Sequence, residues 1–128
     1  MTAREYRPFE PARHPGGKPS EKPRYRILVH RKFRNHWSDL VDRVGIQQAK
    51  QFWDHVSTTP GQKSPLASIA ILRGKAGLPM ADGWSRTLHY EVTGAGRIDY
   101  QFHNEYQTHQ GGDKHQVVAI LTISYGSH

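Results

Sequence analysis

Polar and apolar residues alternate along residues 25–33, 84–92 and 97–103, and residues 117–125 form the most apolar segment of the chain. Alternation with a period of two is typical of β-strands that have one buried face. Turn-forming or polar residues separate the last three segments, which favours an antiparallel meander. The pattern therefore predicts one strand early in the chain and three in its second half.

Between the first two predicted strands, apolar residues recur at helical spacing. Gly45 interrupts this pattern and Thr59-Pro60-Gly61 ends it, which predicts two short helices or one bent helix over residues 36–58. Residues 61–83 are rich in chain-breaking residues and are expected to form mostly loop. The order strand, helices, three strands predicts an α+β fold with two helices packed on a four-stranded antiparallel sheet.

The first 23 residues differ in composition from the rest. They contain five of the eight prolines, the pair Gly16-Gly17, five basic and three acidic residues. Such a segment cannot form a helix and has little to bury. We therefore expect an extended or disordered basic arm over residues 1–23 and a folded domain over residues 24–128.

The composition excludes several classes of protein. The chain has 128 residues, enough for one domain, and no cysteine, so disulfide bonds, cysteine-based zinc sites and a cysteine nucleophile are excluded. Its longest apolar run, residues 117–121, is far short of the roughly 20 residues of a membrane span. The N-terminus lacks the apolar core of a signal peptide. We expect a cytoplasmic protein with no membrane partner.

The chain is strongly basic, with 18 Lys and Arg against 11 Asp and Glu and a net charge of +7. This surplus suits nucleic acid or an acidic protein partner, although it also serves solubility alone. Three histidines at positions 103, 109 and 115 recur every six residues, a spacing that places ligands on neither a helix face nor a strand face. We expect no metal and no other cofactor.

The last two predicted strands bring cationic residues together. If Phe102 or His103 pairs near Val117, Arg97 lies opposite about Ile123, and the chain end falls close to Arg97.

The polar face of the preceding strand would add His89, and Arg73 and Lys75 could reach over it from the loop. Metal-free RNA cleavage needs a base for the ribose 2′-hydroxyl, positive charge for the phosphorane and an acid for the leaving 5′-oxygen. This surface could supply all three. The alternative is a solvated polar face with no chemistry.

Four short motifs occur in an order and spacing that resemble the RelE/YoeB branch of bacterial toxins. They are Leu72-Arg73-Gly74, Gly83-Trp84-Ser85-Arg86, Arg97-Ile98-Asp99-Tyr100 and the last strand with its end, residues 118–128. The resemblance covers about residues 25–128. It implies a RelE-like fold, in which a β-α-α-β-β-β chain forms a four-stranded antiparallel sheet with two helices on one face.

The resemblance also implies an activity and partners. Members of this branch are endoribonucleases that cut mRNA on the ribosome, and a cognate antitoxin protein neutralises them. Arg97 matches the phosphate-binding arginine of the family, and His128 or Tyr125 matches the catalytic residues that follow its last strand. Arg73, Lys75 and Arg86 are then candidate RNA-binding residues.

Three positions depart from the family pattern. Ser85 and Thr87 stand where RelE-like members have lysines, and Ala70 falls near the glutamate that acts as base in YoeB-like members. His89 is the substitute candidate for the general base. Two other readings stay open: a ParE-like toxin that inhibits DNA gyrase without cutting nucleic acid, and a non-enzymatic protein that binds RNA or the ribosome.

Overall fold

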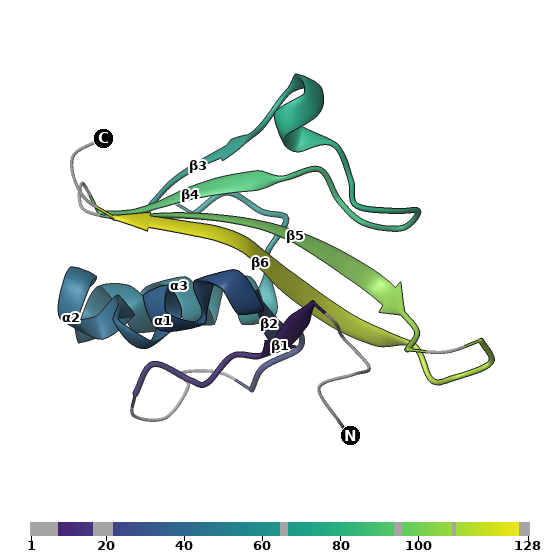
Figure 1. Cartoon of the computed structure of the whole chain (residues 1–128), viewed down its shortest axis with the longest axis horizontal. Coiled ribbons are helices and arrows are strands. Elements are labelled where there is room, and N and C mark those ends of the chain that lie inside the picture. Colours follow the sequence, from purple (N-terminus) through teal and green to yellow (C-terminus); the bar gives the residue numbers. More distant parts are fainter. Residues whose placement is uncertain (1–7, 17–21, 65–66, 94–95, 109, 126–128) are drawn as a thin grey trace.

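The computed structural model describes residues 8–16, 22–64, 67–93, 96–108 and 110–125. In these ranges six strands form one sheet in the order β1-β2-β6-β5-β4-β3. The strands are β1 Phe9–Pro11, β2 Arg26–His30, β3 Ser68–Ile71, β4 Leu88–Thr93, β5 Gly96–Tyr106 and β6 His115–Tyr125. The helices are α1 Arg34–Ser38, α2 Leu40–Val44 and α3 Ile46–Thr58, with 3₁₀ turns η2 Arg31–Phe33 and η3 Gly74–Gly77. Figure 1 shows the three helices on one face of the sheet.

The α+β class is confirmed, but the predicted four-stranded antiparallel sheet is wrong in two respects. The sheet has six strands in the described ranges, and β2 pairs with β6 in parallel, with Ile27 opposite Val118. Both strands are buried on both faces at this point, as are the central strands of most sheets. Their apolar residues therefore place them together in the middle, although they come from opposite ends of the chain.

The N-terminal segment contributes the first edge strand. β1 pairs antiparallel with β2, and Phe9 is only 9% exposed. Arg13 accepts a hydrogen bond from the indole of Trp37 at 2.9 Å, and Glu10 binds the guanidinium of Arg34. The expectation that this segment has little to bury is thus wrong for residues 8–16. Its prolines are compatible with an edge strand, which has one side free of ladder hydrogen bonds.

Two further elements differ from the predicted boundaries. The apolar residues near position 70, predicted as part of a loop, form the second edge strand, β3, which pairs with β4. Trp84, predicted to open a strand, makes one isolated bridge to His103, and β4 begins only at Leu88. The helical region lies where the sequence predicts it, but it holds three helices in the described ranges rather than two. Gly45 separates α2 from α3 with φ of +91°, a conformation that glycine adopts without strain.

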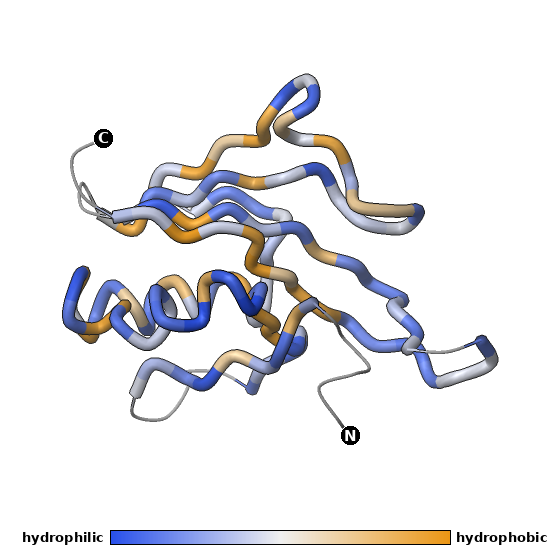
Figure 2. Tube along the Cα trace, in the orientation of Figure 1, coloured by the Kyte–Doolittle hydropathy of each residue, from blue (hydrophilic) through white to orange (hydrophobic). Residues whose placement is uncertain are grey.

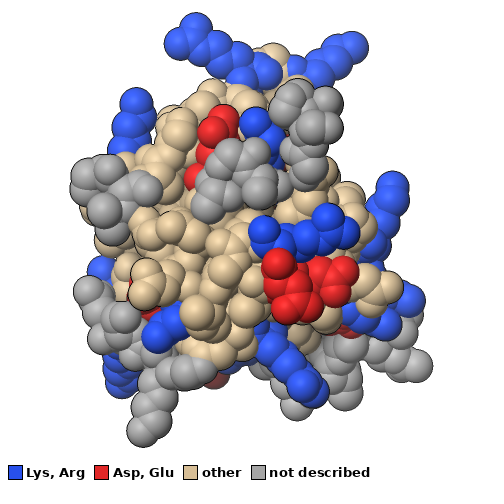
Figure 3. Space-filling view, turned by 90° about the vertical axis from the view of Figure 1, so that its left-hand side faces the viewer, with Lys and Arg blue, Asp and Glu red and all other residues tan. Residues whose placement is uncertain are grey.

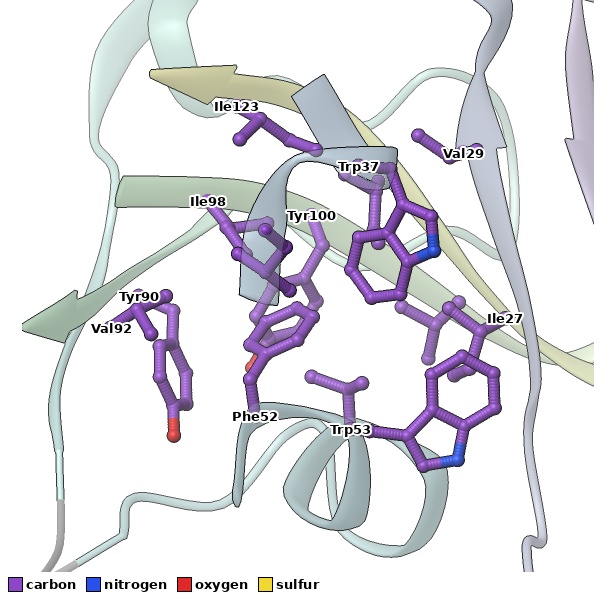
Figure 4. Packing of buried hydrophobic residues seen from close by; sticks show 14 of the residues in the cluster. Ile27, Val29, Trp37, Phe52, Trp53, Tyr90, Val92, Ile98, Tyr100 and Ile123 are labelled. Atoms are coloured by element: carbon purple, nitrogen blue, oxygen red, sulfur yellow. The ribbon is translucent and has the colours of Figure 1, made fainter. Parts of the chain in front are cut away.

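The core lies between the helices and the sheet. Figure 2 shows apolar residues gathered in the central strands and along the inner sides of the helices. Phe52 of α3 is fully buried and meets the ring of Tyr90 at 4.9 Å edge-to-face. Trp37 and Trp53 close the cluster beside the start of β2 (Figure 4). Aromatic rings in this arrangement bury a large apolar area and fix the helices on the sheet.

In the described ranges the opposite sheet face carries no α-helix and is covered only in part. Residues 72–84 fold over its middle, above the sheet in Figure 1. The buried amide of Gln101 fastens this loop, because it donates to Leu78 O and Thr87 Oγ1 and accepts from Met80 N. The end of this face near the C-terminal part of β6 stays open to solvent. None of the helices in the described ranges is long and apolar enough to cross a membrane.

Candidate functional site

Two polar pairs lie next to each other on the open sheet face. His89 of β4 is opposite Asp99 of β5, and one step along the strands Glu91 is opposite Arg97. Their neighbours in sequence, such as Tyr90, point into the helix-covered core, so strand alternation places all four polar side chains on the same face. The predicted candidates His89 and Arg97 are therefore brought together by the hairpin.

The His89–Asp99 pair has the geometry of a positioned proton-transfer group. Nδ1 of His89 lies 2.5 Å from Oδ1 of Asp99, and the two side chains are 29% and 24% exposed. An ionised carboxylate only accepts hydrogen bonds, so Nδ1 is the donor and Nε2 is left to exchange a proton with a ligand. A carboxylate in this position holds the ring and stabilises the imidazolium that forms when Nε2 takes a proton.

Arg97 supplies the permanent positive charge of the site. Its Nε lies 4.0 Å from Glu91 Oε1, with the two side chains 29% and 41% exposed. An ion pair this long and this exposed contributes little, so the guanidinium can turn to another anion at small cost. Two residues along one strand span about 6.8 Å, so Arg97 and Asp99 are close enough for one phosphodiester to reach both pairs.

β6 places a hydroxyl group next to each of the two polar pairs. Thr122 pairs with Asp99 and Ser124 pairs with Arg97, and both side chains are exposed. Neither hydroxyl is a cation, but both can donate hydrogen bonds to phosphate oxygens. The site is therefore a shallow polar strip across three strands.

Tyr125 does not belong to this strip. The register places it opposite Gly96, and its side chain lies on the helix-covered face. Its hydroxyl donates to His36 O at 2.6 Å, its ring stacks on that of His36, and Arg43 lies 5.1 Å from the ring centroid. Burial raises the pKa of Tyr125 to about 12, with Asp39 adding to the effect. The expectation that Tyr125 acts beside Arg97 is therefore not supported by its position.

The predicted strand register is close to the one observed. His103 is opposite Val117, as expected, and Arg97 is opposite Ser124, one residue from the predicted Ile123. The candidate His128 lies outside the described residues.

The three candidate RNA-binding residues divide into two groups. Arg86 is a brace within the loop, since its Nε donates to Leu72 O and its Nη2 to Gly74 O. Arg73 and Lys75 are exposed on the turn η3 that Arg86 holds. Of the three candidates, Arg73 and Lys75 are therefore the exposed cations on the loop that folds over the open face.

Sequence patterns missed the acidic members of the site. The alternation of polar and apolar residues places Asp99 and Glu91 on the polar face of their strands but does not show which residues they pair with. The signal was present, because a short hairpin turn fixes which residues of two adjacent strands are opposite each other. No cluster of three or more His, Asp or Glu side chains in the described ranges could hold a metal ion, and His109 lies outside them.

Charge is distributed widely over the surface. On the side of the molecule in Figure 3, Lys and Arg side chains project in several directions, with acidic groups between them. Binding of an anion at the open strip would therefore depend on a few placed groups rather than on a broad basic patch. No family model, curated protein or solved structure matches this chain.

Proposed function

We propose that this chain is a RelE-like toxin that cleaves translated mRNA without a metal ion, using the strip around His89 and Arg97. The observation that carries the proposal is the His89–Asp99 pair with Arg97 beside it on an open sheet face. A positioned imidazole next to a guanidinium can supply two of the three functions that metal-free RNA cleavage requires, the base for the 2′-hydroxyl and the positive charge for the phosphorane.

In the proposed reaction the ribose 2′-oxygen attacks the adjacent phosphorus. Nε2 of His89 takes the proton of the ribose 2′-hydroxyl, and the 2′-oxygen forms a bond to phosphorus. Arg97 neutralises the additional negative charge of the phosphorane. The bond from phosphorus to the 5′-oxygen then breaks, and the 5′-oxygen receives a proton from an acid, for which His128 remains the candidate. The products are a 2′,3′-cyclic phosphate and a 5′-hydroxyl.

The topology supports a RelE-like fold as part of the proposal. β2, the helices, β4, β5 and β6 follow the order that the sequence resemblance implies, and the helices cover one face. The edge strands β1 and β3 are additions to that expectation, and the parallel pairing of β2 with β6 departs from the antiparallel sheet that it implies. A cognate antitoxin, mRNA and the ribosome are the partners proposed for such a protein.

One observation favours a protein that binds RNA or the ribosome without cleaving RNA. Arg97 is the permanent cation of the two pairs, and it stands against the carboxylates of Glu91 and Asp99, so these pairs carry no surplus of positive charge for a phosphorane. In that case Asp99 would serve to hold the sheet face together rather than to orient a base. A gyrase-binding toxin is the other non-cleaving candidate.

The test is cleavage of an mRNA on purified ribosomes, with the ends of the fragments mapped and their chemistry determined. We expect 2′,3′-cyclic phosphate ends, and strong loss of cutting for His89→Gln, Asp99→Asn and Arg97→Ala. Tyr125→Phe is the matched control, because the structure places Tyr125 on the other face, and it should keep its activity. Intact mRNA with normal DNA supercoiling would favour the binding protein, and intact mRNA with lost supercoiling the gyrase-binding toxin.

A further inference from the structure

The edge strand β3 has backbone groups that point away from the sheet. Along an antiparallel strand every second residue faces the neighbouring strand. Leu72, directly after β3, donates its N–H to Thr87 O at 2.9 Å. By this alternation Ala70 also faces β4, whereas the N–H and C=O groups of Ile69 and Ile71 point outward. In the described ranges no strand lies beyond β3, so these groups are open to a further strand (Figure 1).

The two edges of the sheet differ in their protection against such pairing. Natural edge strands are usually very short or carry a proline or a charge. β1 has three residues, and they include Glu10 and Pro11. β3 has the sequence Ser-Ile-Ala-Ile, with neither proline nor charge, and its last residue, Ile71, is 57% exposed. β3 is therefore the edge at which another strand can pair.

The side chain of Ile71 also lacks cover. Ile69 is opposite Tyr90 and Ile71 is opposite Leu88, so both isoleucines lie on the helix side of the sheet. Ile69 packs on the core, but Ile71 lies beyond it and meets solvent. A partner strand with a β-branched side chain opposite Ile71 would remove this apolar surface from water.

β3 of a second copy is complementary to this edge. If two copies pair antiparallel about Ala70, Ile71 of each copy lies opposite Ile69 of the other, and the outward backbone groups of both form hydrogen bonds. Ala70 then lies opposite its own equivalent in a pair whose Cα atoms are only about 4.5 Å apart, which suits a small side chain. Residues 67–72 include no charged residue, so two copies of a chain with net charge +7 can approach here.

We propose that this chain forms a symmetric dimer through β3, in which the two sheets join edge to edge about Ala70. The two-fold axis is perpendicular to the sheet, so the open faces of both copies lie on the same side. His89 is opposite Ala70, so the two His89 residues are three strand spacings, or about 14 Å, apart. The strand contact is small, and we expect a dissociation constant of roughly 10–100 µM. The dimer does not require RNA cleavage, so it holds or fails independently of the proposed function.

The first test is sedimentation equilibrium of the full chain, up to about ten times the expected dissociation constant. Ile71→Lys places a charge in the contact, as natural edge strands do, so we expect association to weaken by about tenfold or more. Leu78→Lys is the matched control, because Leu78 is 58% exposed but its carbonyl is bound by Gln101 on the open face. It should associate as the unchanged chain does.

Two results of this test overturn the proposal. One is a chain that stays monomeric throughout, which would leave the edge to a strand of a different protein. The other is a folded Ile71→Lys variant that dimerises as the unchanged chain does, which would place the contact elsewhere.

The second test examines the register and uses the absence of cysteine from the chain. Ala70→Cys would place two thiols across the axis with Cα atoms about 4.5 Å apart, within the range of a disulfide bond. Oxidation with diamide should therefore give a covalent dimer. Ser68→Cys is the matched control on the same strand, also exposed, and its two copies would lie about 14 Å apart along the strand direction. Crosslinking of Ser68→Cys at the same or a higher rate overturns the proposal. If Ile71→Lys fails to fold, this comparison decides the outcome.

Discussion

The two faces of the sheet are built from alternate residues of the same strands but differ in what holds them. On the helix-covered face Tyr90 and Tyr100 pack against Phe52 and are fully buried. On the open face their neighbours His89 and Asp99 form a pair that is about a quarter exposed. The helix-covered face therefore holds the main core, and the part of the open face around His89 and Asp99 can carry polar chemistry at little cost to the fold.

The first way to test this comparison is to remove the centre of the covered face. Phe52→Ala should lower the free energy of unfolding by about 3–5 kcal/mol, because a fully buried aromatic ring is replaced by a cavity. Thr122→Ala on the open face should change it by about 0.5 kcal/mol or less. Urea denaturation followed by circular dichroism measures both. Equal losses would mean that the open face is part of the core.

The second test changes residues of the open face and measures RNA cleavage. Arg97→Ala should slow RNA cleavage by about 10²–10³-fold, since a charge donor to the transition state is lost. His89→Gln should slow it by roughly 10²–10⁴-fold. Both variants should unfold within about 1 kcal/mol of the unchanged chain, because exposed ion pairs contribute little. Full activity in both would exclude the strip as a catalytic site.

The third test concerns the edge that the N-terminal segment covers. Phe9→Ala should cost about 1.5–3 kcal/mol of stability, because Phe9 is buried against Leu28 and Val117 on the open side of the sheet. Pro8→Ala, next to it and exposed, is the control and should have little effect. This expectation is opposite to the one from sequence, in which residues 1–23 form an arm with little to bury. A loss below the error of the measurement would restore the sequence-based boundary.

The fourth test uses pH. Burial raises the pKa of Tyr90 to about 12 and raises that of Tyr100 further, whereas both titrate near 10 when unfolded. The unfolded chain thus releases these protons first as pH rises, so stability should be intact below pH 10 and fall as pH rises from about 10 to 12. The Tyr90 share is about 3 kcal/mol, from two pKa units. In Tyr90→Phe the fall should be shallower; an identical fall would place the titration elsewhere.

Periodicity predicted most of the elements because each depends on local sequence. The alternation over residues 25–33 and 97–103 and the helical spacing around Gly45 correspond to observed strands and helices. The parallel pairing of β2 with β6 was not predicted, because it joins segments far apart in the chain and both are apolar on both faces. β1 was missed because its prolines are typical of a loop and only one side of the strand is paired.

The candidate site was predicted in part for the same reason. The alternation of side chains along each strand predicted that His89 and Arg97 share a polar face, and the hairpin of β4 and β5 brings them together. Tyr125 was misplaced because it was assigned by nearness to the chain end, whereas parity puts it with Ile123 on the covered face. The role of Asp99 as the partner of His89 was not predicted, because it depends on the register between β4 and β5 and not on the pattern of one strand.

The pairing of Ile27 with Val118 has a consequence for synthesis of the protein. β2 is translated early and has no central partner until β6 follows, roughly 90 positions later, or about 5–18 s at ordinary elongation rates. The hydroxyl rows of the open strip also end on β6. A nascent chain therefore cannot complete the sheet until β6 has been translated. Its polar face forms only after that strand has been made.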